Sequence, residues 1–475
     1  MYDVAIIGAG MSGLAAGIRL AMFGQQVCIL ERHYAVGGLN SYYRIDGRNY
    51  DVGLHALTNF AARGAKQGPL PRLLRQLRLS WDDFELAEQG TSSIDFPGVR
   101  LRFSNDSSQL ATEIRRLFPS ETDRYQGFLE RLLGYDQLQQ AVAATSARQT
   151  LAKIFREPLL AEMLLCPVLY YGGPREHDID WGSFSILFRS IFLEGLARPR
   201  TGIRAILKHL TKRYKHLGGE LRLRAGVRKI VEGEGRAQSI LLDDGSELTA
   251  RQIVSSAGWN ETMRMCQAEN DSNLSSHPNF TEAGRLTFIE SICTLDCQPR
   301  ELSFDNTIVF YNNSSRFNYA CPDDFADLNS GIVCSPNNYC YQDAKIDPAE
   351  GTLRLTALAN FDRWAGLGND EYQQQKLHWH RQLVATAGRF VPNLASHIVA
   401  NDTFTPKTIV HFTGHDNGAV YGAPRKRYDA KTHLENLFIC GADQGFVGII
   451  GTLTSGIQVA NMLLRASTHS LTTDS

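Results

Sequence analysis

Residues 2–40 read YDVAIIGAGMSGLAAGIRLAMFGQQVCILERHYAVGGLN, and this segment decides the fold of the chain. It opens with the apolar run 4–7, which predicts a short strand buried on both faces. A helix-compatible run, 14–23, follows and stops at Gly24, a residue typical of helix C-termini. Residues 26–30 then predict a second strand. The order strand, helix, strand indicates an α/β unit at the start of the chain.

Three glycines, Gly8, Gly10 and Gly13, stand between the first strand and the helix in the spacing GxGxxG. The first permits a tight turn, the second lets a pyrophosphate approach the backbone, and the third lets the helix pack close to the strand. The helix N-terminus then offers free N–H groups and a positive dipole end to phosphates. Glu31, at the end of the second strand, is placed to accept hydrogen bonds from a ribose. A glycine-rich turn that binds nothing would not need this context, so the segment predicts a dinucleotide site.

The residues after Glu31 carry a resemblance to a known family. Arg32 and the pair Gly37 and Gly38 complete an ERHxxxGG pattern, which resembles the FAD-binding signature of the flavin amine oxidase and carotenoid desaturase superfamily. The resemblance implies that FAD is the cofactor and that Arg32 lies near its phosphates or ribose. Leu39 follows the glycine pair where many carotenoid desaturases carry an arginine or lysine, so the contact made there is expected to differ.

The C-terminal segment 436–464 reads NLFICGADQGFVGIIGTLTSGIQVANMLL and carries the same resemblance. It is similar to the last flavin-binding motif of the superfamily, a strand that runs into a glycine-rich helix start. The likeness implies that Asp443 binds the ribityl chain or a hydroxyl on the phosphate side. It also implies that the helix N-terminus near 448–452 directs its positive end at the N1–C2=O region of the flavin.

Two internal segments extend the likeness. In 198–258 a helix and several short strands follow the order found in the superfamily, which implies that the backbone of Val227 contacts the adenine. YDVGLHAL, at 50–57, resembles the DxGxH segment of carotenoid desaturases and retinol saturase-like enzymes. His55 could therefore face the isoalloxazine or the substrate, or it could only hydrogen-bond a loop. His411 and His415 are the other candidates for a proton-handling role.

The site residues expected from these motifs fall into two groups. The catalytic candidate is His55, and no metal site is expected. The cofactor-binding candidates are Gly8, Gly10, Ser12, Gly13, Glu31, Arg32, Gly37, Gly38, Leu39, Val227, Gly441, Asp443, Gly448 and Ile450.

The predicted fold class is α/β, with a Rossmann-type FAD-binding domain and an inserted α+β substrate domain that contains a mixed or antiparallel sheet and helices. With 475 residues the chain is long enough for two or three domains. The predicted FAD-binding domain is discontinuous and comprises 1–90, 199–260 and 402–475. The predicted substrate domain comprises 91–198 and 261–401.

Composition limits the function classes. The formal net charge of −1 gives no reason to expect nucleic-acid binding. The nine cysteines show no CxxC spacing and no nearby histidine cluster, which argues against a disulfide framework or a zinc site and favours a reducing cytosol. No signal peptide and no run of about 18 to 20 apolar residues is apparent, so a cytoplasmic location is expected.

Two amphipathic segments leave membrane contact open. Residues 70–81 predict a helix with leucines at helical spacing and arginines between them, which is typical of a solvated surface helix or of a helix on anionic lipid. Residues 181–197 place Phe184, Phe188 and Phe192 on one stripe. Such a stripe is most often core, but it could also line a tunnel for a hydrophobic substrate or enter a bilayer interface.

The predicted function is an FAD-dependent oxidoreductase that transfers hydride between a hydrophobic isoprenoid or polyene substrate and flavin N5. Desaturation, saturation and isomerisation share this site design, so the direction stays open. Two alternatives also stay open: a flavin amine oxidase, and an FAD-binding protein without catalysis. The expected partner is a hydrophobic small molecule, and the oligomeric state is open.

Overall fold

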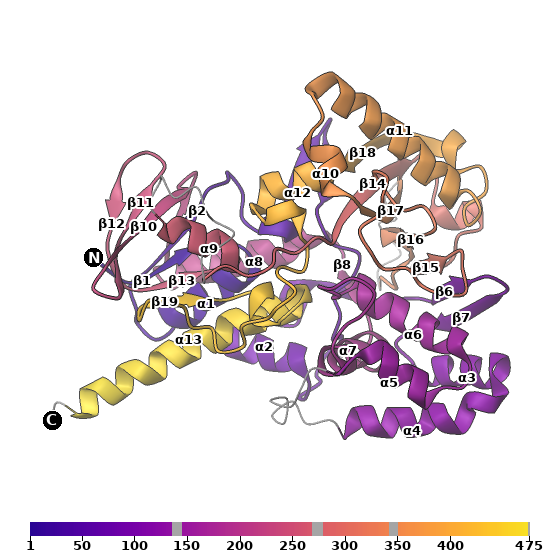
Figure 1. Cartoon of the computed structure of the whole chain (residues 1–475), viewed down its shortest axis with the longest axis horizontal. Helices are drawn as coiled ribbons and strands as arrows, with labels where there is room; N and C mark the ends of the chain where they lie inside the picture. The colour runs from indigo at the N-terminus through magenta and orange to yellow at the C-terminus, as the bar shows by residue number, and fades with distance from the viewer. Residues whose placement is uncertain (135–144, 268–278, 342–349, 474–475) are drawn as a thin grey trace.

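A five-stranded parallel sheet brings together strands from both ends of the chain in this computed structural model, which describes residues 1–134, 145–267, 279–341 and 350–473 (Figure 1). The strand order is β19-β13-β1-β2-β9. Their bounds are β1 Tyr2–Ile7, β2 Val27–Glu31, β9 Glu220–Leu223, β13 Ala250–Ser255 and β19 Leu437–Ile439. The predicted strand, helix and strand of the first segment are all present.

The two faces of this sheet are covered differently, which explains the unbroken apolar runs of β1 and β2. On one face, Val4 and Ile6 pack against helices α1 (Met11–Ala21), α2 (Pro69–Leu77), α8 (Ile203–His216) and α13 (Gly448–Thr473). On the other face, Ala5 and Ile7 pack against a three-stranded antiparallel sheet. That sheet consists of β10 Val227–Gly233, β11 Arg236–Leu242 and β12 Glu247–Leu248.

The first and last long helices cross at very short range. Gly456 of α13 packs on the backbone of Ser12 in α1, and a Cβ at position 456 would lie 2.0 Å from the Ser12 carbonyl oxygen. On another side of α1, a Cβ at Gly17 would lie 2.8 Å from the Ile29 side chain of β2 and 2.9 Å from the Tyr214 ring of α8. Because the contact at Gly456 needs glycine, the C-terminal helix is fitted in sequence to its crossing with α1.

A second sheet of seven strands has the order β18-β14-β17-β16-β15-β6-β7. Neighbouring strands are antiparallel except for β15 and β6, which are parallel. This confirms the predicted mixed or antiparallel sheet. The bounds are β6 Ser92–Phe96, β7 Val99–Phe103, β14 Thr287–Leu295, β15 Ile308–Asn312, β16 Ser330–Cys334, β17 Gly351–Ala359 and β18 Ile398–Phe404.

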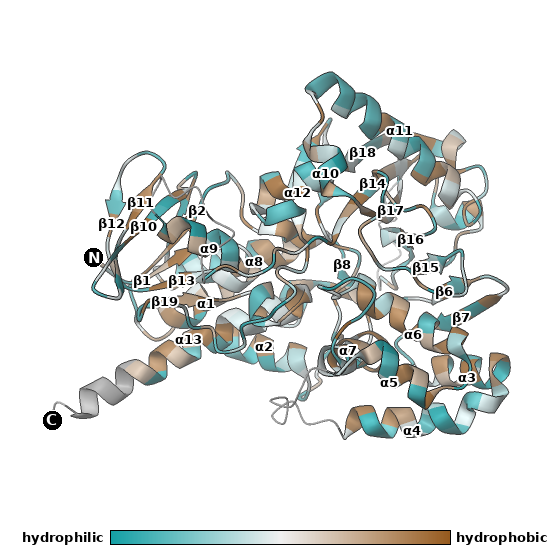
Figure 2. Cartoon of the chain, viewed as in Figure 1, coloured by the Kyte–Doolittle hydropathy of each residue, from teal (hydrophilic) through white to brown (hydrophobic). Residues whose placement is uncertain are grey.

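Helices cover both faces of the second sheet. One face holds α3 Ser107–Leu117, α4 Thr122–Leu133, α5 Ala147–Ile154, α6 Pro158–Tyr170 and α7 Trp181–Phe188, and the other holds α10 Phe361–Ala365 and α11 Asn369–Ala387. The outer surface of α11 is hydrophilic, whereas β14 and β17 beneath it are mostly hydrophobic (Figure 2). The remaining elements are α9 Trp259–Cys266, α12 Pro406–Thr413, the hairpin β3 Tyr42–Ile45 with β4 Arg48–Asp51, and the pair β5 Leu86–Glu88 with β8 Ala197–Pro199.

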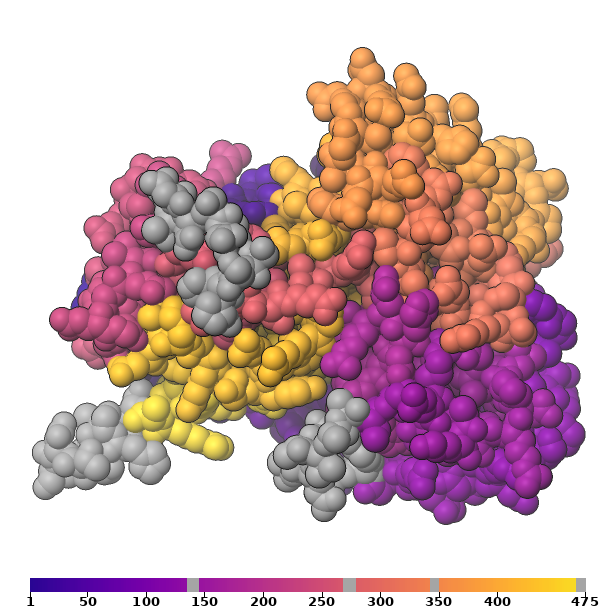
Figure 3. All heavy atoms as spheres, viewed as in Figure 1, coloured from indigo at the N-terminus to yellow at the C-terminus, as the bar shows by residue number. Residues whose placement is uncertain are grey.

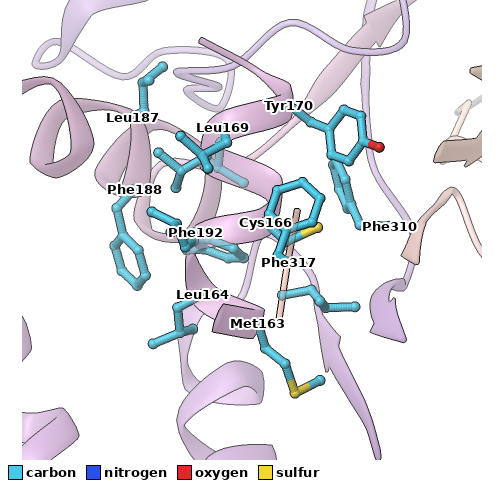
Figure 4. Close-up of a cluster of buried hydrophobic side chains, with 14 of the residues drawn as sticks. Met163, Leu164, Cys166, Leu169, Tyr170, Leu187, Phe188, Phe192, Phe310 and Phe317 are labelled. Atoms are coloured by element: carbon cyan, nitrogen blue, oxygen red, sulfur yellow. The ribbon is translucent and has the colours of Figure 1, made fainter. Parts of the chain in front are cut away.

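The phenylalanine stripe is core, as the commoner interpretation of the sequence predicted. Phe184, Phe188 and Phe192 are at most 1% exposed. The rings of Phe188 and Phe192 lie tilted against each other with centroids 4.7 Å apart (Figure 4). Phe103 of β7 meets Phe192 edge-on at 5.0 Å. The stripe is therefore not a surface that enters a bilayer.

The predicted basic helix is also present, as α2, and it ends at Arg78 in a left-handed conformation. Its apolar face is buried against α1 and α13, and its basic face is exposed. The buried residues are Leu70, Leu73, Leu74 and Leu77, and the exposed ones are Arg72, Arg75 and Arg78. Among the residues that the structure describes, no helix combines the length and the apolar character needed to cross a bilayer.

The chain forms two lobes that each draw on distant segments (Figure 3). One lobe gathers the N-terminal, the 200–265 and the C-terminal segments, and the other gathers most of 91–198 and 285–404. The predicted domain limits stay a prediction. Three of them fall within elements, namely β8, α9 and β18, since sequence patterns do not show where a strand passes from one lobe to the next.

Candidate active site

A cavity of about 470 Å³ lies where the two lobes meet and is lined by residues of both. The parallel sheet contributes the loops that follow β1, β2, β13 and β19, and the seven-stranded sheet contributes β14, β16 and β17. The carboxyl ends of parallel strands are the usual binding edge of such a sheet. Most of the predicted site residues meet in this one cavity, as described below.

The N-terminal glycines divide into two roles. Gly8 and Gly10 line the cavity, and so does Ser12 in the first turn of α1. A Cβ at position 10 would meet its nearest neighbour only at 3.8 Å, so this glycine keeps space open on the cavity side. Gly13 does not line the cavity: a Cβ there would lie 2.1 Å from the carbonyl oxygen of Gly8. Gly13 therefore serves the packing of helix on strand, as its place in the motif predicts.

The first turn of α1 suits an anionic ligand. The helix has no side-chain cap and no acidic residue in its first turn. Its free N–H groups and its positive dipole end are therefore not compensated by the protein. They open directly on the cavity at Gly10, Met11 and Ser12.

Glu31 lines the cavity and is 6% exposed. Its two carboxylate oxygens accept hydrogen bonds from the backbone N–H groups of Ala9, at 2.8 Å, and His33, at 2.9 Å. An ionised carboxylate has about four lone-pair sites, so acceptor capacity remains on the cavity side. This is the capacity that two ribose hydroxyls require.

Arg32 also lines the cavity, but its guanidinium holds another element in place. It donates to the carbonyl oxygens of Val410 and His411, at 3.3 and 3.0 Å, near the C-terminus of α12. Such a cation at a helix C-terminus is favourable. The expected contact of Arg32 with phosphates or ribose stays a prediction.

The loop that carries Gly37 and Gly38 lies against the first glycine turn. The N–H of Gly37 donates to the carbonyl oxygen of Ala9 at 2.9 Å, and Gly37 and Gly38 adopt φ of 116° and 56°. The pair therefore lies directly beside the first glycine turn. Gly37, Gly38 and Leu39 all line the cavity, as does Val227 at the start of β10.

At the C-terminal motif, Gly441, Asp443 and Gly448 line the cavity. Asp443 is 4% exposed and accepts hydrogen bonds from the N–H groups of Trp259 and Ala423, each at 2.6 Å. It thus ties two loops to the start of α13. Ile450 is the exception among the candidates here, because it is 2% exposed within the core and does not line the cavity.

Two neighbours of Ile450 line the cavity in its stead. Ile449 and Thr452 line the cavity in the first turn of α13, which carries no acidic residue. Successive helical residues point about 100° apart, so only one side of this turn can face the ligand. The N-terminus of α13 therefore opens on the cavity, as the C-terminal motif implied.

His55 lies at the border between the two lobes and lines the cavity. Its Nε2 is 3.1 Å from Oε2 of Glu290 in β14 and 2.9 Å from Oγ1 of Thr356 in β17. Burial lowers the pKa of His55, and Glu290 offsets this only in part. His55 is therefore neutral at pH 7. The histidine does more than hydrogen-bond a loop, because a buried carboxylate holds its ring.

Charged residues behind His55 form a buried network. Glu290 makes an ion pair with Arg354, and both side chains are at most 3% exposed. Burial raises the pKa of Glu290, but Arg354 and His55 outweigh that effect and hold the pKa at about 2. Arg198 donates to the carbonyl oxygen of His55 at 3.1 Å and pairs with Asp51 at 2.8 Å. Both the ring and the backbone of His55 are thus fixed.

The remaining wall of the cavity is apolar and aromatic. It is formed by Tyr170, Tyr171, Phe288, Ile332, Val420, Tyr421 and Val447. Tyr171 stacks near His55 with ring centroids 6.3 Å apart. Phe184, Phe188 and Phe192 do not contribute to this wall, so the stripe that was considered for a substrate tunnel lies behind it as core.

The other two histidine candidates are placed differently. His411 does not line the cavity, and its carbonyl oxygen accepts from Arg32, so it is removed from the proton-handling candidates. His415 lines the cavity near Glu261 and Asp443. Burial lowers its pKa, but Glu261, 3.4 Å away, and the nearby aspartates raise it above the ordinary value. A histidine that keeps its proton in this way is a poor base.

Sequence reasoning missed Glu290, Thr356, Arg354 and Tyr171. A usable signal exists for two of them: Glu290 and Arg354 are the lone charged residues of the otherwise uncharged strands 287–295 and 351–359. A charge in a strand buried on both faces is rarely tolerated without a partner. The pairing itself could not be read from the sequence, since the two strands are separated by two others along the chain.

The residues present fit an FAD molecule by their chemistry. Two uncompensated helix N-termini face the cavity, Gly10 leaves open space beside one of them, and Glu31 keeps free acceptor sites. Such a set suits a pyrophosphate, a ribose and an anionic ring system. The expected absence of a metal stays a prediction.

The comparisons with known proteins agree with this site. The family model for flavin-containing amine oxidoreductases matches residues 11–464. Prolycopene isomerase from Arabidopsis thaliana is 22% identical, over 97% of this chain and 82% of the relative. All-trans-retinol 13,14-reductase from Danio rerio is 23% identical, over 98% of this chain and 86% of the relative.

A solved structure of an oxidoreductase from Methanosarcina mazei aligns with a TM-score of 0.65 and 16% identity, over 96% of this chain and 99% of that one. At this identity the likeness shows the fold. Since the family model covers nearly the whole chain and the cavity carries the groups that FAD requires, the protein is an FAD-dependent oxidoreductase that belongs to the flavin-containing amine oxidoreductase family.

Proposed function

We propose that the protein moves hydride between a hydrophobic isoprenoid or polyene substrate and FAD. The observation that carries the proposal is the composition of the cavity, in which an aromatic and aliphatic wall adjoins the dinucleotide groups without a free charge on that wall. The names of the two curated relatives, an isomerase of prolycopene and a reductase of all-trans-retinol, support the same substrate class. Desaturation, saturation and isomerisation all fit this arrangement.

The cofactor would be held by residues from both ends of the chain. In the proposal, Gly8, Gly10, Ser12 and α1 bind the pyrophosphate, and Glu31 binds the adenosine ribose. Val227 lies toward the adenine, and Asp443 with the start of α13 lies toward the flavin end. When bound, the isoalloxazine ring accepts or returns the hydride at N5.

The protein's own contribution is to bind, orient and exclude water. The wall of Tyr170, Tyr171, Phe288 and Tyr421 presents ring faces and edges to an extended apolar chain. His55 lies beside this wall and is proposed to handle the proton, because burial raises the pKa of the hydroxyls of Tyr170, Tyr171 and Tyr421. An apolar pocket with few polar groups is typical of sites for small hydrophobic ligands.

Amine oxidation is the alternative within the same family. An amine substrate that binds as an ammonium ion needs a free carboxylate or an aromatic cage to steer it. Glu290 is a carboxylate of the cavity lining, and it is already paired with Arg354 and hydrogen-bonded to His55. The pairing disfavours an amine, although Tyr171 and Tyr421 would suit one.

Anaerobic reduction of the flavin tests the proposal. The purified holoprotein is mixed with long-chain polyenes, then with polyenols and finally with primary amines, and the loss of absorbance near the flavin maximum is followed. We expect bleaching by a member of the polyene classes. Bleaching by amines alone would contradict the proposed substrate class, and no bleaching by any of them would contradict the oxidative direction.

A substitution in the apolar wall sharpens this test. Val447→Trp fills part of the cavity, so we expect the flavin spectrum to remain and bleaching by polyene to slow by at least about tenfold. The matched control is Val399→Trp, at a valine that is 51% exposed on β18. Equal rates in both variants would show that the wall does not receive the substrate.

We also propose a cytoplasmic location with peripheral contact to anionic lipid through the basic face of α2. Arg72, Arg75 and Arg78 share a surface hollow with Arg19 and Phe23, and the Phe23 ring is 54% exposed. Basic residues around an exposed aromatic ring suit an anionic headgroup region. The sequence offered two apolar surfaces for membrane contact, the leucines of α2 and the phenylalanine stripe, and both are buried. The basic face of α2 and Phe23 are what remains in support of the contact.

Flotation with phosphatidylglycerol vesicles at low salt tests this contact. Reversing the charge of the three α2 arginines to glutamate should abolish flotation. The matched control reverses three exposed arginines on α3 and α4: Arg115, Arg116 and Arg131. Equal flotation of both variants, or none by the wild type, would contradict the proposal.

A further inference from the structure

We propose that Glu290 is a positioning residue of the reaction, which keeps the proton of neutral His55 on Nε2 and leaves the lone pair of Nδ1 to exchange a proton with the substrate. The inference rests on the proposed function and adds the group that holds the base.

The proton on Nε2 follows from its two neighbours. Thr356 donates its hydroxyl hydrogen to Oε2 of Glu290 at 3.1 Å, so its oxygen can act only as an acceptor toward His55. The Thr356 oxygen lies 2.9 Å from Nε2, and the Glu290 oxygen lies 3.1 Å from it. With two acceptors in front of it, Nε2 must carry the hydrogen.

Nδ1 is the nitrogen that remains. In the described part of the chain it has no hydrogen-bond partner, while its ring lines the cavity beside Tyr171. A neutral imidazole protonated on one nitrogen has an acceptor lone pair on the other. The free lone pair therefore belongs to the nitrogen that Glu290 does not hold.

Glu290 can do this only as an anion, and the structure keeps it one. Arg354 pairs with it, and the guanidinium is anchored in turn by a 2.9 Å hydrogen bond to the carbonyl oxygen of Asp51. Both ionised side chains are buried, so each compensates the desolvation of the other. The carboxylate is thus fixed in position as well as in charge.

The groups that face His55 have opposing effects on the charge of its ring. Glu290 on β14 favours the imidazolium, whereas Arg354 on β17 and Arg198 on β8 disfavour it, as burial does. Tyr171 at the end of α6 and Tyr339, whose hydroxyl donates to the His55 carbonyl oxygen at 2.9 Å, add no formal charge. The ring is therefore neutral before the reaction and is stabilised as a cation when it takes up a proton, which is what a general base requires.

In the desaturating direction, two neighbouring carbons of the substrate lose a hydride and a proton. One carbon of the substrate loses hydride to the oxidised flavin, and the neighbouring carbon loses a proton to Nδ1 of His55. The electron pair of that second C–H bond becomes the new π bond, and His55 becomes an imidazolium paired with Glu290. In the saturating direction the imidazolium returns the proton.

A direct test of the tautomer needs neither substrate nor flavin. Two-bond ¹⁵N–¹H correlation spectra of ¹⁵N-histidine-labelled apoprotein distinguish the Nε2–H form from the Nδ1–H form. The signals of His55 are identified among the thirteen histidines by their absence in His55→Gln. We expect the Nε2–H tautomer at pH 7.5, and the Nδ1–H tautomer or a cation there would overturn the proposal.

Substitution of Glu290 then tests the consequence. For Glu290→Gln we expect a mixture of tautomers and a fall of about 10²- to 10⁴-fold in the rate of flavin reduction, with KM little changed. Thr356→Val leaves the carboxylate in place, so the Nε2–H tautomer should persist and the rate should fall less than tenfold. A folded, flavin-loaded Glu290→Gln protein with the wild-type rate and pH profile would overturn the proposal.

Two further variants serve as a folding safeguard and as a control. Glu290→Gln leaves Arg354 buried without its partner and could fail to fold, so the double variant Glu290→Gln/Arg354→Met removes both charges together. His380→Gln is the control: His380 is also buried and hydrogen-bonds Ser291, but it lies on α11 outside the cavity, so the pH profile should not change.

The two proposals fail in distinguishable ways. If no polyene reduces the oxidised flavin and none reoxidises the reduced flavin, hydride transfer with this substrate class is contradicted, and the apoprotein spectra still report the tautomer. If the polyenes do reduce it but His55 carries its proton on Nδ1, the function stands and the role of Glu290 is contradicted.

Discussion

Single glycines in the first motif act by two separable physical effects, and the structure assigns one to each. Gly10 leaves room for a ligand on the cavity side, and Gly13 lets the helix pack closely on the strand. A methyl group added at the two positions should therefore report on binding in one case and on folding in the other.

For Gly10→Ala we expect a stable apoprotein whose Kd for FAD rises about 5- to 150-fold, because the new methyl group occupies ligand space. For Gly13→Ala we expect the free energy of unfolding to fall by at least about 1–3 kcal/mol, because the Cβ collides with the Gly8 carbonyl oxygen. Flavin fluorescence titration and urea unfolding measure the two effects. If Gly10→Ala bound FAD like the wild type, the pyrophosphate would not lie at this turn.

The buried His55 should leave a signature in the acid stability of the apoprotein. Burial lowers its pKa in the folded state below the ordinary value of 6.5, so between the two values the unfolded chain binds more protons. Stability from this group is therefore complete above about pH 6.5 and falls as the pH drops below it. The low pKa of Glu290 keeps that carboxylate out of this window.

His55→Gln should accordingly lose less stability than the wild type between pH 7.5 and 5.5, measured as urea midpoints of the apoprotein. His378→Gln, at an exposed histidine of α11, should follow the wild type. Parallel curves for His55→Gln and the wild type would mean that His55 is not desolvated.

Most of the residues that the sequence motifs predicted do line the cavity, but the motifs did not reveal its charged network. Spacing rules revealed Gly8, Gly10 and Glu31, since each has a fixed place in a local motif. Glu290 and Arg354 obey no local spacing, because their contact depends on the register between β14 and β17. Such pairings arise from the tertiary fold, so a sequence shows only that each charge needs a partner.

At the scale of elements, the crossing of α1 and α13 positions two helix N-termini that line the cavity. Ser12 belongs to the first turn of α1, and Gly456 of α13 lies on its backbone. The two helix N-termini that face the cavity are held at this distance by the absence of one side chain.

Gly456→Ala should therefore lower the free energy of unfolding by at least about 1–3 kcal/mol and weaken FAD binding, because the helices must separate. The matched control is Gly127→Ala in α4, where a Cβ would meet nothing within 4 Å. There the better helix former should raise stability by about 0.5–1 kcal/mol. Thermal melts compare the pair, and equal shifts in the same direction would contradict the close crossing.

The elements that the sequence predicted, such as the first strand, helix and strand and the basic helix α2, followed from periodicity and helix-end residues. The hairpin of β3 and β4 turns at Asp46 and Gly47, both at the positive φ that is typical of an Asp-Gly turn. β18 carries no such signal, since IVANDTF has no clear alternation and its polar residues are accommodated at the edge of the sheet. Edge strands bury less, so their sequence carries less of the signal.

At the scale of the molecule, FAD in the proposed arrangement would connect segments that lie at the two ends of the chain. A ligand that binds only the folded state adds RT ln(1 + [L]/Kd) to the free energy of unfolding. FAD at about 100 times its Kd should add about 2.7 kcal/mol and raise Tm accordingly.

FMN and AMP, each at the same excess over the apoprotein, serve as controls because each is one half of the cofactor. Both should bind more weakly and give smaller shifts than FAD in differential scanning fluorimetry. A shift with FMN equal to that with FAD would show that the N-terminal glycine turn and Glu31 do not grip the adenylate half.

The late position of α13 has a consequence for synthesis in the cell. A ribosome releases Gly8 and Glu31 early, but Gly441 and Gly456 emerge only after both sheets have been translated. Until then the part of α1 that packs on α13 is uncovered, and the C-terminal side of the cavity has not formed. We therefore expect cofactor loading to follow the end of synthesis, while the nascent chain presents an apolar surface of the kind that chaperones recognise.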